Sequence, residues 1–245
     1  LRASTIYARV CFLSSFYEWA MRDPELGQHI GKNPVHQARP RAPKAYQTES
    51  VKSLTDKELD KLVSFVARKA ESGDLVGKRD YAILLLFMAT GMRRQEVLSL
   101  RGRDVKVDDT LVLTNRVKGG TYIGREVDDP QVKEALLDYL RSARRLEVFR
   151  IDGPLWTRHD KAGRPGAALS SHSYVKNLKR YAKEAGIEKF HMHQTRHTFA
   201  RIVAEETGSI IETQDALNHR NPSTTRIYVQ RIAVKRDKHS ARISK

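Results

Sequence analysis

Cysteine is nearly absent from this chain of 245 residues, because Cys11 is the only one. No intrachain disulfide can form, and we expect the protein to work in a reducing compartment. Long hydrophobic runs are also missing. The longest apolar stretch, residues 81–89, is far shorter than the ~20 residues that a membrane-spanning helix needs. The first residues show no signal-peptide pattern, so we expect no membrane partner. Because the sequence begins with leucine, we expect further residues upstream.

Three common motifs of nucleotide and metal chemistry are missing as well. The sequence has no G-x-x-x-x-G-K-[ST] phosphate loop, no H-E-x-x-H motif and no cluster of cysteine with histidine. These absences give no support to ATP-driven or zinc-dependent chemistry. We therefore predict an activity without cofactor or metal.

Positive charge is what the chain has in excess. It contains 45 Lys and Arg against 29 Asp and Glu, a net charge of +16, with a pI of about 10.0. Such a balance indicates a polyanionic partner, of which nucleic acid is the usual one. Ribosomal proteins and proteins that bind anionic membranes share this composition, so charge alone does not decide between them. A hydrophobic content of 40% is sufficient for a sizeable core.

The pattern of apolar residues predicts a mainly α-helical protein with one small antiparallel sheet, an α+β fold class. Residues 4–22 are expected to form an amphipathic helix whose apolar face needs a partner. Residues 31–50 are rich in proline and basic residues and are predicted to be a linker. Further helices are expected at about residues 55–68, 78–90, 93–100, 130–145, 171–185, 193–206, 209–217 and from 223, and strands within 104–109, 110–117, 121–129 and 154–157.

Two short motifs place charged residues where a phosphate could bind. His193 and Arg196 are three residues apart, so on a helix both project from one face. A guanidinium can bind two phosphate oxygens, and an imidazole exchanges protons near neutral pH. Arg93 follows Gly91 at a helix start, which favours a bound anion, and Glu96 is placed to orient it. Taken alone, the Arg93 motif is equally typical of ordinary surface residues in a basic protein, and H-x-x-R is more typical of them.

A lysine and a tyrosine extend this set toward phosphoryl transfer. Lys118 lies at the tip of a predicted hairpin, where it is either solvated or able to protonate a leaving oxygen. Tyr228 follows His219 by nine residues. A phenol has a pKa of ~10, so its attack on phosphorus needs a base or a positive field. Exchange of one phosphoester for another needs no ATP, and no metal if arginines neutralise the transition state.

The order of these residues resembles that of the tyrosine recombinases, the phage-integrase and Xer-like family. The segment TGMRRQEVLSL (residues 90–100) resembles T-G-x-R-x-x-E-x-L-x-L, and HQTRHTFA (193–200) resembles H-x-L-R-H-T-F-A. LNH and the tyrosine nine residues later resemble the family's L-G-H…Y. The likeness covers about residues 30–230. The chain departs from the pattern at Thr195, where leucine is usual, and at Asn218, where glycine is usual; asparagine tolerates the left-handed backbone that glycine would adopt.

The resemblance implies the tyrosine recombinase catalytic-domain fold and a cleavage mechanism. The tyrosine would attack the scissile phosphate to form a 3′-phosphotyrosyl link, and strands would exchange through a Holliday junction. The catalytic residues that it implies are Arg93, Lys118, His193, Arg196, His219 and Tyr228. Glu96 and His197 are expected to support them, and DNA contacts are expected from Arg39, Arg41, Lys44, Arg94 and Arg125.

The resemblance also implies partners and a domain plan. We expect double-stranded DNA, a tetramer acting on two DNA sites, accessory DNA-bending or directionality factors, and a cytoplasmic location at the nucleoid or an equivalent compartment. Residues 1–30 would be the last part of a helical core-binding domain, followed by the linker (31–50) and the catalytic domain (51–230). The basic tail (231–245) either docks on a neighbouring protomer or contacts DNA.

Two alternatives share these residues. A type IB topoisomerase-like or telomere-resolving enzyme would use the same chemistry and differ in which end religates. A DNA-binding relative without catalysis would occupy sites without cutting them. All six expected reacting residues are present in the sequence, which argues against a decayed relative.

Overall fold

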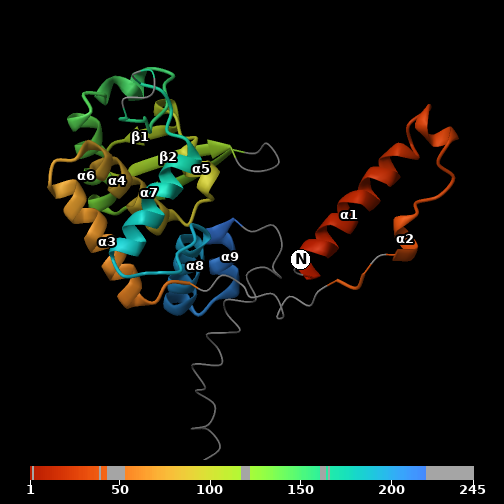
Figure 1. Cartoon of the computed structure of the whole chain (residues 1–245). Coiled ribbons are helices and arrows are strands. Elements are labelled where there is room, and N and C mark those ends of the chain that lie inside the picture. Colours follow the sequence, from red (N-terminus) through yellow and green to blue (C-terminus); the bar gives the residue numbers. More distant parts are fainter. Residues whose placement is uncertain are drawn as a thin grey trace, which may run out of the picture. The chain divides into compact units, whose positions relative to one another are not determined.

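The computed structural model describes most of the chain as two separate units (Figure 1). These units are Leu1–Ser50 and Val51–Lys245. Within the described part of the chain, none of the helices combines the length and hydrophobicity that crossing a bilayer requires. The described residues are 1, 3–38, 40–42, 53–116, 122–160, 164 and 166–218. Five residues that were expected to act on DNA lie outside them: Arg39, Lys44, Lys118, His219 and Tyr228.

The first unit is a helix with a returning segment. Helix α1 (Ala3–Ala20) is followed by a 3-10 turn, η1 (Leu26–Gln28), and by α2 (Val35–Ala38). The amide of Asn33 donates to the carbonyl oxygen of Ser14 at 3.1 Å and to its hydroxyl at 3.0 Å, which holds the return against α1. The expected apolar face of α1 is exposed, with Leu13 49% and Trp19 56% exposed.

Helix α2 departs from the expectation of an irregular linker. This single helical turn lies inside the proline-rich stretch. The side-chain oxygen of Asn33 accepts a hydrogen bond from the backbone N–H of Val35 at 3.0 Å, so a local cap initiates the turn. The prediction missed it because one turn is too short to give a periodic pattern.

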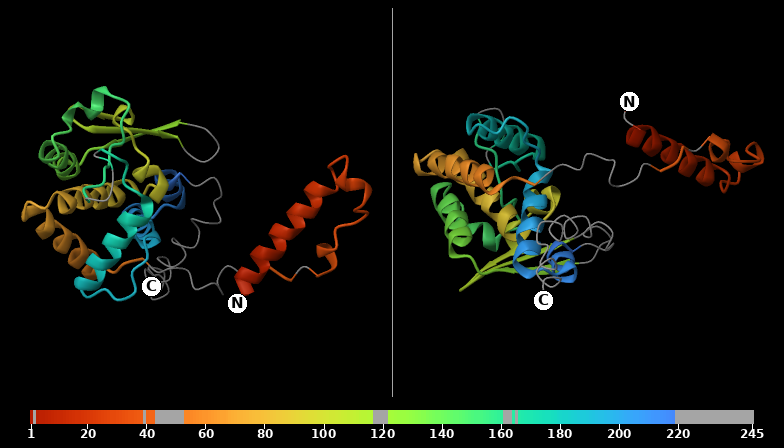
Figure 2. Two further views of the ribbon diagram at one scale, coloured as in Figure 1. Left: turned by 45° about the horizontal axis from the view of Figure 1, so that its top comes forward. Right: turned by 90° about the horizontal axis from the view of Figure 1, so that it is seen from below.

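Over its described residues, the second unit has the predicted architecture: helices with one three-stranded antiparallel sheet in the order β1-β2-β3. The strands lie at one edge of the helical body in both views of Figure 2. Its helices are α3 (Asp56–Glu71), α4 (Leu75–Thr90), α5 (Arg94–Leu98), α6 (Pro130–Ser142), α7 (Ser171–Glu184), α8 (His193–Thr207) and α9 (Ile210–Leu217). The strands are β1 (Val105–Val107), β2 (Leu111–Arg116) and β3 (Tyr122–Val127), and two 3-10 helices are η2 (Gly102–Asp104) and η3 (Leu146–Arg150).

Local capping accounts for most helix ends. At the start of α3, the Glu58 carboxylate accepts from the Thr55 N–H at 2.8 Å, as the predicted capping box requires. Helix α4 begins three residues earlier than predicted, because the Asp74 carboxylate caps it by accepting from the N–H of Val76 at 3.1 Å. Its predicted end at Gly91, with φ of 57°, is confirmed.

Two expectations near the sheet were wrong. Residues 154–157 were expected to form a strand, yet they make only isolated bridges, between Arg101 and Pro154 and between Thr157 and Ala168. Helix α6 stops at Ser142, before the predicted end at about residue 145, because Arg144 takes a left-handed backbone with φ of 53°.

Helix α4 is the centre of the second unit. It contacts α3, α5, α6, α7 and α8, and its residues 82–87 are all buried. Near its start, Arg79 and Asp80 form a buried ion pair at 2.7 Å, and the other Asp80 oxygen accepts from the Asn177 amide at 2.9 Å. This packing on all sides makes the C-terminal end of α4 a fixed point, from which Arg93 follows.

Candidate active site

The turn after α4 brings the Arg93 segment close to α8. Gly91 has a φ of 57°, and a Cβ atom placed on it would lie 2.1 Å from the Phe199 ring of α8. Only glycine fits both the left-handed backbone and this close approach. Met92 then returns to the core, and Arg93 has an extended backbone as the N-cap of α5.

A buried carboxylate orients Arg93, as the sequence predicted. Glu96 is 9% exposed, and one of its oxygens accepts from Arg93 Nη1 at 3.0 Å. Its other oxygen accepts from the backbone N–H of Arg93 at 2.8 Å. The Arg93 side chain remains 40% exposed. The guanidinium is therefore fixed in direction while part of it still faces solvent.

Helix α8 supplies a second guanidinium and an imidazole. Arg196 is 6% exposed, and its Nη1 donates to the carbonyl of Gly91 and its Nη2 to that of Leu217, the latter at 2.6 Å. These bonds use two of the five N–H donors of the guanidinium. His193 reaches the surface, and its ring is 5.4 Å from that of His197, edge to face.

The pKa of His193 is lowered, first by partial burial and then by the positive charges of Arg196, Arg94 and Arg93. The side chain is therefore mainly neutral at pH 7 and able to accept a proton. Because the charges of Arg196, Arg94 and Arg93 all act on His193, these arginines lie near its imidazole. The structure thus brings together Arg93, Glu96, His193 and Arg196, which are separated by about a hundred residues of sequence.

Arg125 also belongs to this neighbourhood, in a way that the sequence interpretation missed. Its Nη1 donates to the carbonyl of Ala216 at 2.9 Å and to that of Thr90 at 3.4 Å. The pKa of Arg125 is lowered by burial, raised in part by Glu96 and lowered further by Arg93. It was expected to contact DNA, but these bonds direct its guanidinium toward the ends of two helices.

The sequence held a signal for this placement. Along β3, Ile123, Arg125 and Val127 alternate with the exposed Tyr122 and Glu126. Side chains alternate between the two faces of a strand, so the arginine occupies a position in the apolar, inward register.

The last described helix ends beside this site. Ser209 caps α9 by accepting from the N–H of Glu212 at 3.2 Å, as predicted. Asn218 follows the buried Leu217 with φ of 49°, which confirms that asparagine takes the left-handed backbone expected there. His219 is the next residue in the sequence, so α9 determines where the chain continues toward Tyr228.

Comparison with known proteins decides the family. Residues 52–233 match the model of the phage integrase family. The chain belongs to this family. It is a tyrosine recombinase of Xer-like type, and its helical fold with a small antiparallel sheet is the tyrosine recombinase catalytic-domain fold.

Individual tyrosine recombinases match this chain over most of its length. Tyrosine recombinase XerC of Bacillus subtilis (strain 168) is 31% identical over 236 residues, which cover 93% of this chain and 70% of XerC. Tyrosine recombinase XerA of Thermococcus kodakarensis is 32% identical over 73% of this chain and 58% of XerA. The structure of XerH bound to palindromic difH substrate, a post-cleavage complex, aligns with a TM-score of 0.65. That alignment has 24% identity and spans 79% of this chain and 54% of the XerH chain.

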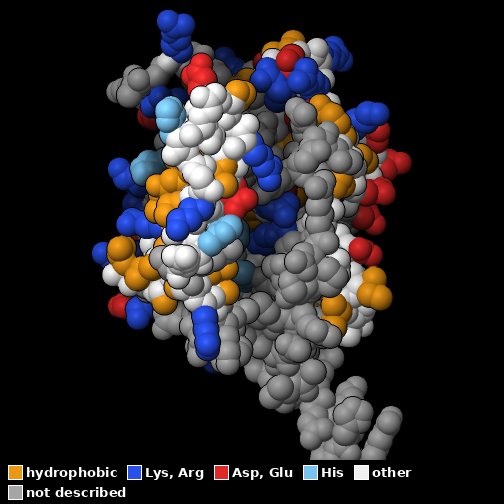
Figure 3. All heavy atoms as spheres, turned by 90° about the vertical axis from the view of Figure 1, so that its right-hand side faces the viewer, with side chains coloured by type: hydrophobic (Ala, Val, Ile, Leu, Met, Phe, Trp, Pro, Cys, Tyr) orange, Lys and Arg blue, Asp and Glu red, His pale blue; other side chains and the backbone are white. Residues whose placement is uncertain are grey.

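The other expected residues of the recombinase have simpler surroundings. Arg94 is exposed on α5, and Arg41 is exposed in the first unit. Thr195, which replaces the usual leucine, is 1% exposed and satisfies its hydroxyl by donating to the carbonyl of Met192 at 2.8 Å. Lys and Arg side chains are scattered across the face shown in Figure 3, whereas acidic side chains gather mainly along its right-hand edge.

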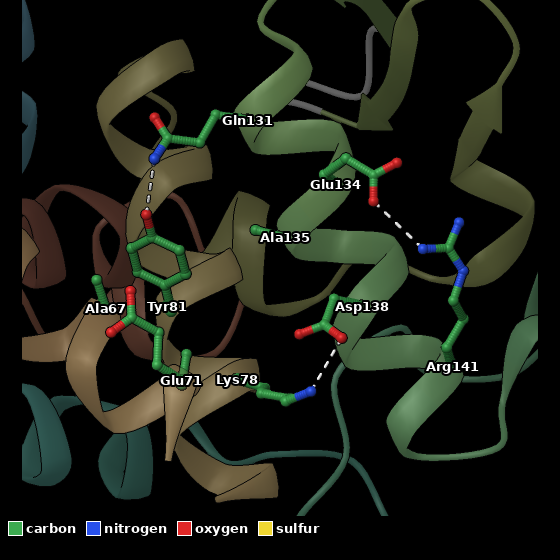
Figure 4. Close-up of a pocket in the computed structure, with 10 residues that line it drawn as sticks. Ala67, Glu71, Lys78, Tyr81, Gln131, Glu134, Ala135, Asp138 and Arg141 are labelled. Carbon is green, nitrogen blue, oxygen red and sulfur yellow. Dashed lines mark hydrogen bonds and ion pairs between the residues drawn. The ribbon is translucent and has the colours of Figure 1, made fainter. Parts of the chain in front are cut away.

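A separate surface hollow shares no residue with the candidate site. It has a volume of about 420 Å³ and lies among α3, α4 and α6 (Figure 4). Lys78 pairs with Asp138 at 2.9 Å across it, and Tyr81 accepts from the Gln131 amide at 2.9 Å. These side chains stabilise the packing of α4 on α6.

Proposed function

We propose that this recombinase cleaves and rejoins double-stranded DNA at specific sites, with Tyr228 as the nucleophile. The observation that carries the proposal is the convergence of two guanidiniums and a neutral imidazole at one place. Arg93 comes from the α4–α5 turn, and Arg196 and His193 come from one face of α8. A pentacoordinate phosphate carries extra negative charge, which such a group of fixed cations stabilises.

Each residue then has a distinct task in the cleavage step. The Tyr228 oxygen forms a bond to phosphorus while the bond from phosphorus to the 5′ oxygen breaks. The phenol proton passes to His193, whose lowered pKa keeps it neutral and ready to accept. Lys118 protonates the departing 5′ oxygen, and His219 donates to a phosphate oxygen. The product is a 3′-phosphotyrosyl link and a free 5′-hydroxyl.

Strand exchange follows by the reverse reaction with a different 5′-hydroxyl. The attacking hydroxyl belongs to the partner duplex, so one exchange creates a Holliday junction and a second resolves it. Names of similar structures support this proposal: one is the site-specific recombinase XerH bound to palindromic difH substrate in a post-cleavage complex, and another is a lambda integrase dimer bound to a COC′ core site. We also propose that four copies of the chain act together on two DNA sites, with accessory DNA-bending or directionality factors. The reaction would take place at the nucleoid or an equivalent compartment.

The chain would be arranged along DNA as the sequence indicated. Residues 1–30 would belong to a helical core-binding domain and residues 31–50 would follow the DNA backbone as a linker. Residues 51–230 would form the catalytic domain, and residues 231–245 would contact a neighbouring protomer or DNA. The exposed apolar face of α1 supports the first of these assignments, because a complete helical domain would cover it.

Covalent trapping tests the proposed chemistry. The protein is incubated with nicked duplexes from the ends of its own genetic element, in EDTA and without ATP, and products are separated on denaturing gels. Tyr228→Phe is expected to abolish the protein–DNA species. Tyr122→Phe is the matched control, since this tyrosine is 65% exposed on β3, and it should retain the species. Tight DNA binding with no covalent species in the wild type would contradict the proposal.

A plasmid assay then separates exchange from relaxation. Supercoiled plasmids with two sites should yield recombined circles, and plasmids with one site should yield few relaxed ones. Relaxation without exchange of partners would instead indicate the topoisomerase-like alternative.

A further inference from the structure

The C-terminal ends of α4 and α9 converge on two arginines. Arg196 donates to the carbonyl of Gly91, just after α4, and to that of Leu217, the last residue of α9. The final carbonyls of a helix have no partner within the helix and carry partial negative charge. Arg196 therefore links the two helix ends through their carbonyl groups.

Arg125 repeats this arrangement one residue earlier on both helices. Its Nη1 donates to the carbonyl of Thr90 in α4 and to that of Ala216 in α9. Two guanidiniums, from β3 and from α8, thus connect consecutive carbonyls at the end of one helix to consecutive carbonyls at the end of the other. We call this group of two arginines and four carbonyls the double bridge.

The burial of Arg125 indicates that the bridge has a purpose beyond packing. Its strand partner across the sheet is Leu113, which is 0% exposed, so the side chain enters the inner face. Its Nε is buried and has no hydrogen-bond partner among the described residues. Burying a partly unsatisfied cation is unfavourable, and an apolar side chain would fill the same space without that penalty. Helix carbonyls and the nearby Glu96 offset the cost.

We propose that Arg125 is a positioning residue for strand cleavage rather than a DNA contact. This inference rests on the proposed function. Arg125 fixes the end of α9 to the end of α4, which is itself fixed by the core. It thereby sets both the place of Leu217, which Arg196 binds, and the point from which the chain leads to His219 and Tyr228.

Loss of Arg125 should therefore slow the chemistry and leave DNA capture intact. Without it, one of the two arginine links between the ends of α9 and α4 is lost, so α9 can shift. A displacement of ~1 Å at reacting groups can reduce a rate about 100-fold. A phosphate contact behaves differently, because its loss changes the slope of log Kd against log salt by ~0.9.

The test uses the full chain with two readouts, the Kd for duplex DNA at several salt concentrations and the rate of covalent linkage at saturating protein. Arg125→Met should lower the linkage rate about 10- to 100-fold, with Kd and its salt slope unchanged. Arg125→Lys, which keeps a charged donor, should recover most of the rate. Arg94→Met is the comparison, because loss of an expected DNA contact should weaken binding and reduce the salt slope.

Hydrogen exchange supplies a structural readout of the same variants. Amides in the last turn of α9, including that of Asn218, should exchange faster in Arg125→Met than in the wild type. If Arg125→Met does not fold, Arg125→Gln replaces it, with the same expectations.

Two results would overturn the inference. One is a linkage rate equal to that of the wild type, and the other is a reduced salt slope, which would make Arg125 a DNA contact. If the wild type and Arg125→Met form the link equally fast, the inference about Arg125 is refuted and the proposed function stands. A wild type that forms no link at Tyr228 contradicts the proposed function and the inference with it.

Discussion

Replacing Gly91 with alanine should lower the free energy of unfolding in two ways. The substitution strains the left-handed backbone of the turn, and it forces the turn against Phe199 of α8. Alanine at a φ of 57° has a left-handed backbone, which costs about 1–2 kcal/mol. Its Cβ would also lie 2.1 Å from Cδ1 and 2.6 Å from Cε1 of Phe199, so that ring must move. Overpacking of this kind costs about 1–3 kcal/mol. The two effects together predict a loss of about 2–5 kcal/mol in the free energy of unfolding.

Gly208→Ala is the matched control for this prediction. Gly208 ends α8 with a φ of 66°, yet an added Cβ would meet nothing within 4 Å. Its substitution should therefore cost only the ~1–2 kcal/mol of the left-handed backbone. The difference between the two variants isolates the clash with Phe199. Gly91→Ala combined with Phe199→Leu should recover part of that difference.

Urea unfolding measures these free energies. The sequence has two tryptophans, and Trp156 is buried in the second unit while Trp19 lies on α1 in the first. In a Trp19→Phe background, fluorescence reports on the second unit alone, and midpoints are compared at constant m value. Equal destabilisation by Gly91→Ala and Gly208→Ala would refute the argument that Gly91 permits the close approach of α8.

Three further predictions concern the site and its support. Glu96→Gln should reduce the covalent linkage rate about 10-fold or more, because Arg93 loses its charged partner, and DNA binding at saturation should remain. The pKa of His193 is lowered, so the imidazole should still accept a proton below pH 6.5. The rate of covalent linkage should fall only as the pH falls through this lowered pKa. In single-turnover pH profiles, His193→Gln should remove that dependence. Thr198→Val should destabilise the second unit by about 1–3 kcal/mol in urea, because the hydroxyl accepts from the buried N–H of Leu54 at 2.9 Å.

Features that depend on neighbouring residues were predictable from the sequence. The capping pair Thr55 and Glu58, the stop at Gly91 and the left-handed Asn218 each follow from local backbone chemistry. The pairing of Glu96 with Arg93 is local too, since three residues on a helix start bring the groups together.

Features that depend on distant parts of the chain were not predictable in this way. The alternation along β3 places Arg125 in the inward register, but it does not show which groups the guanidinium binds, because its acceptors Thr90 and Ala216 are 35 and 91 residues away. Residues 154–157 have apolar side chains typical of a strand. Their backbone forms only isolated bridges, and the Leu155 N–H donates to the carbonyl of Leu100 at 2.9 Å beside the Arg101–Pro154 bridge, so no strand forms. Such contacts arise from the packing of the whole unit, which no local pattern encodes.

Mapping the covalent link tests most directly whether Tyr228 is the nucleophile. The trapped complex is digested with nuclease and protease, and mass spectrometry locates the peptide that carries the remaining nucleotide. We expect one modified peptide, containing Tyr228, joined through a 3′-phosphate. A nucleotide on another residue, or a link through a 5′-phosphate, would contradict it.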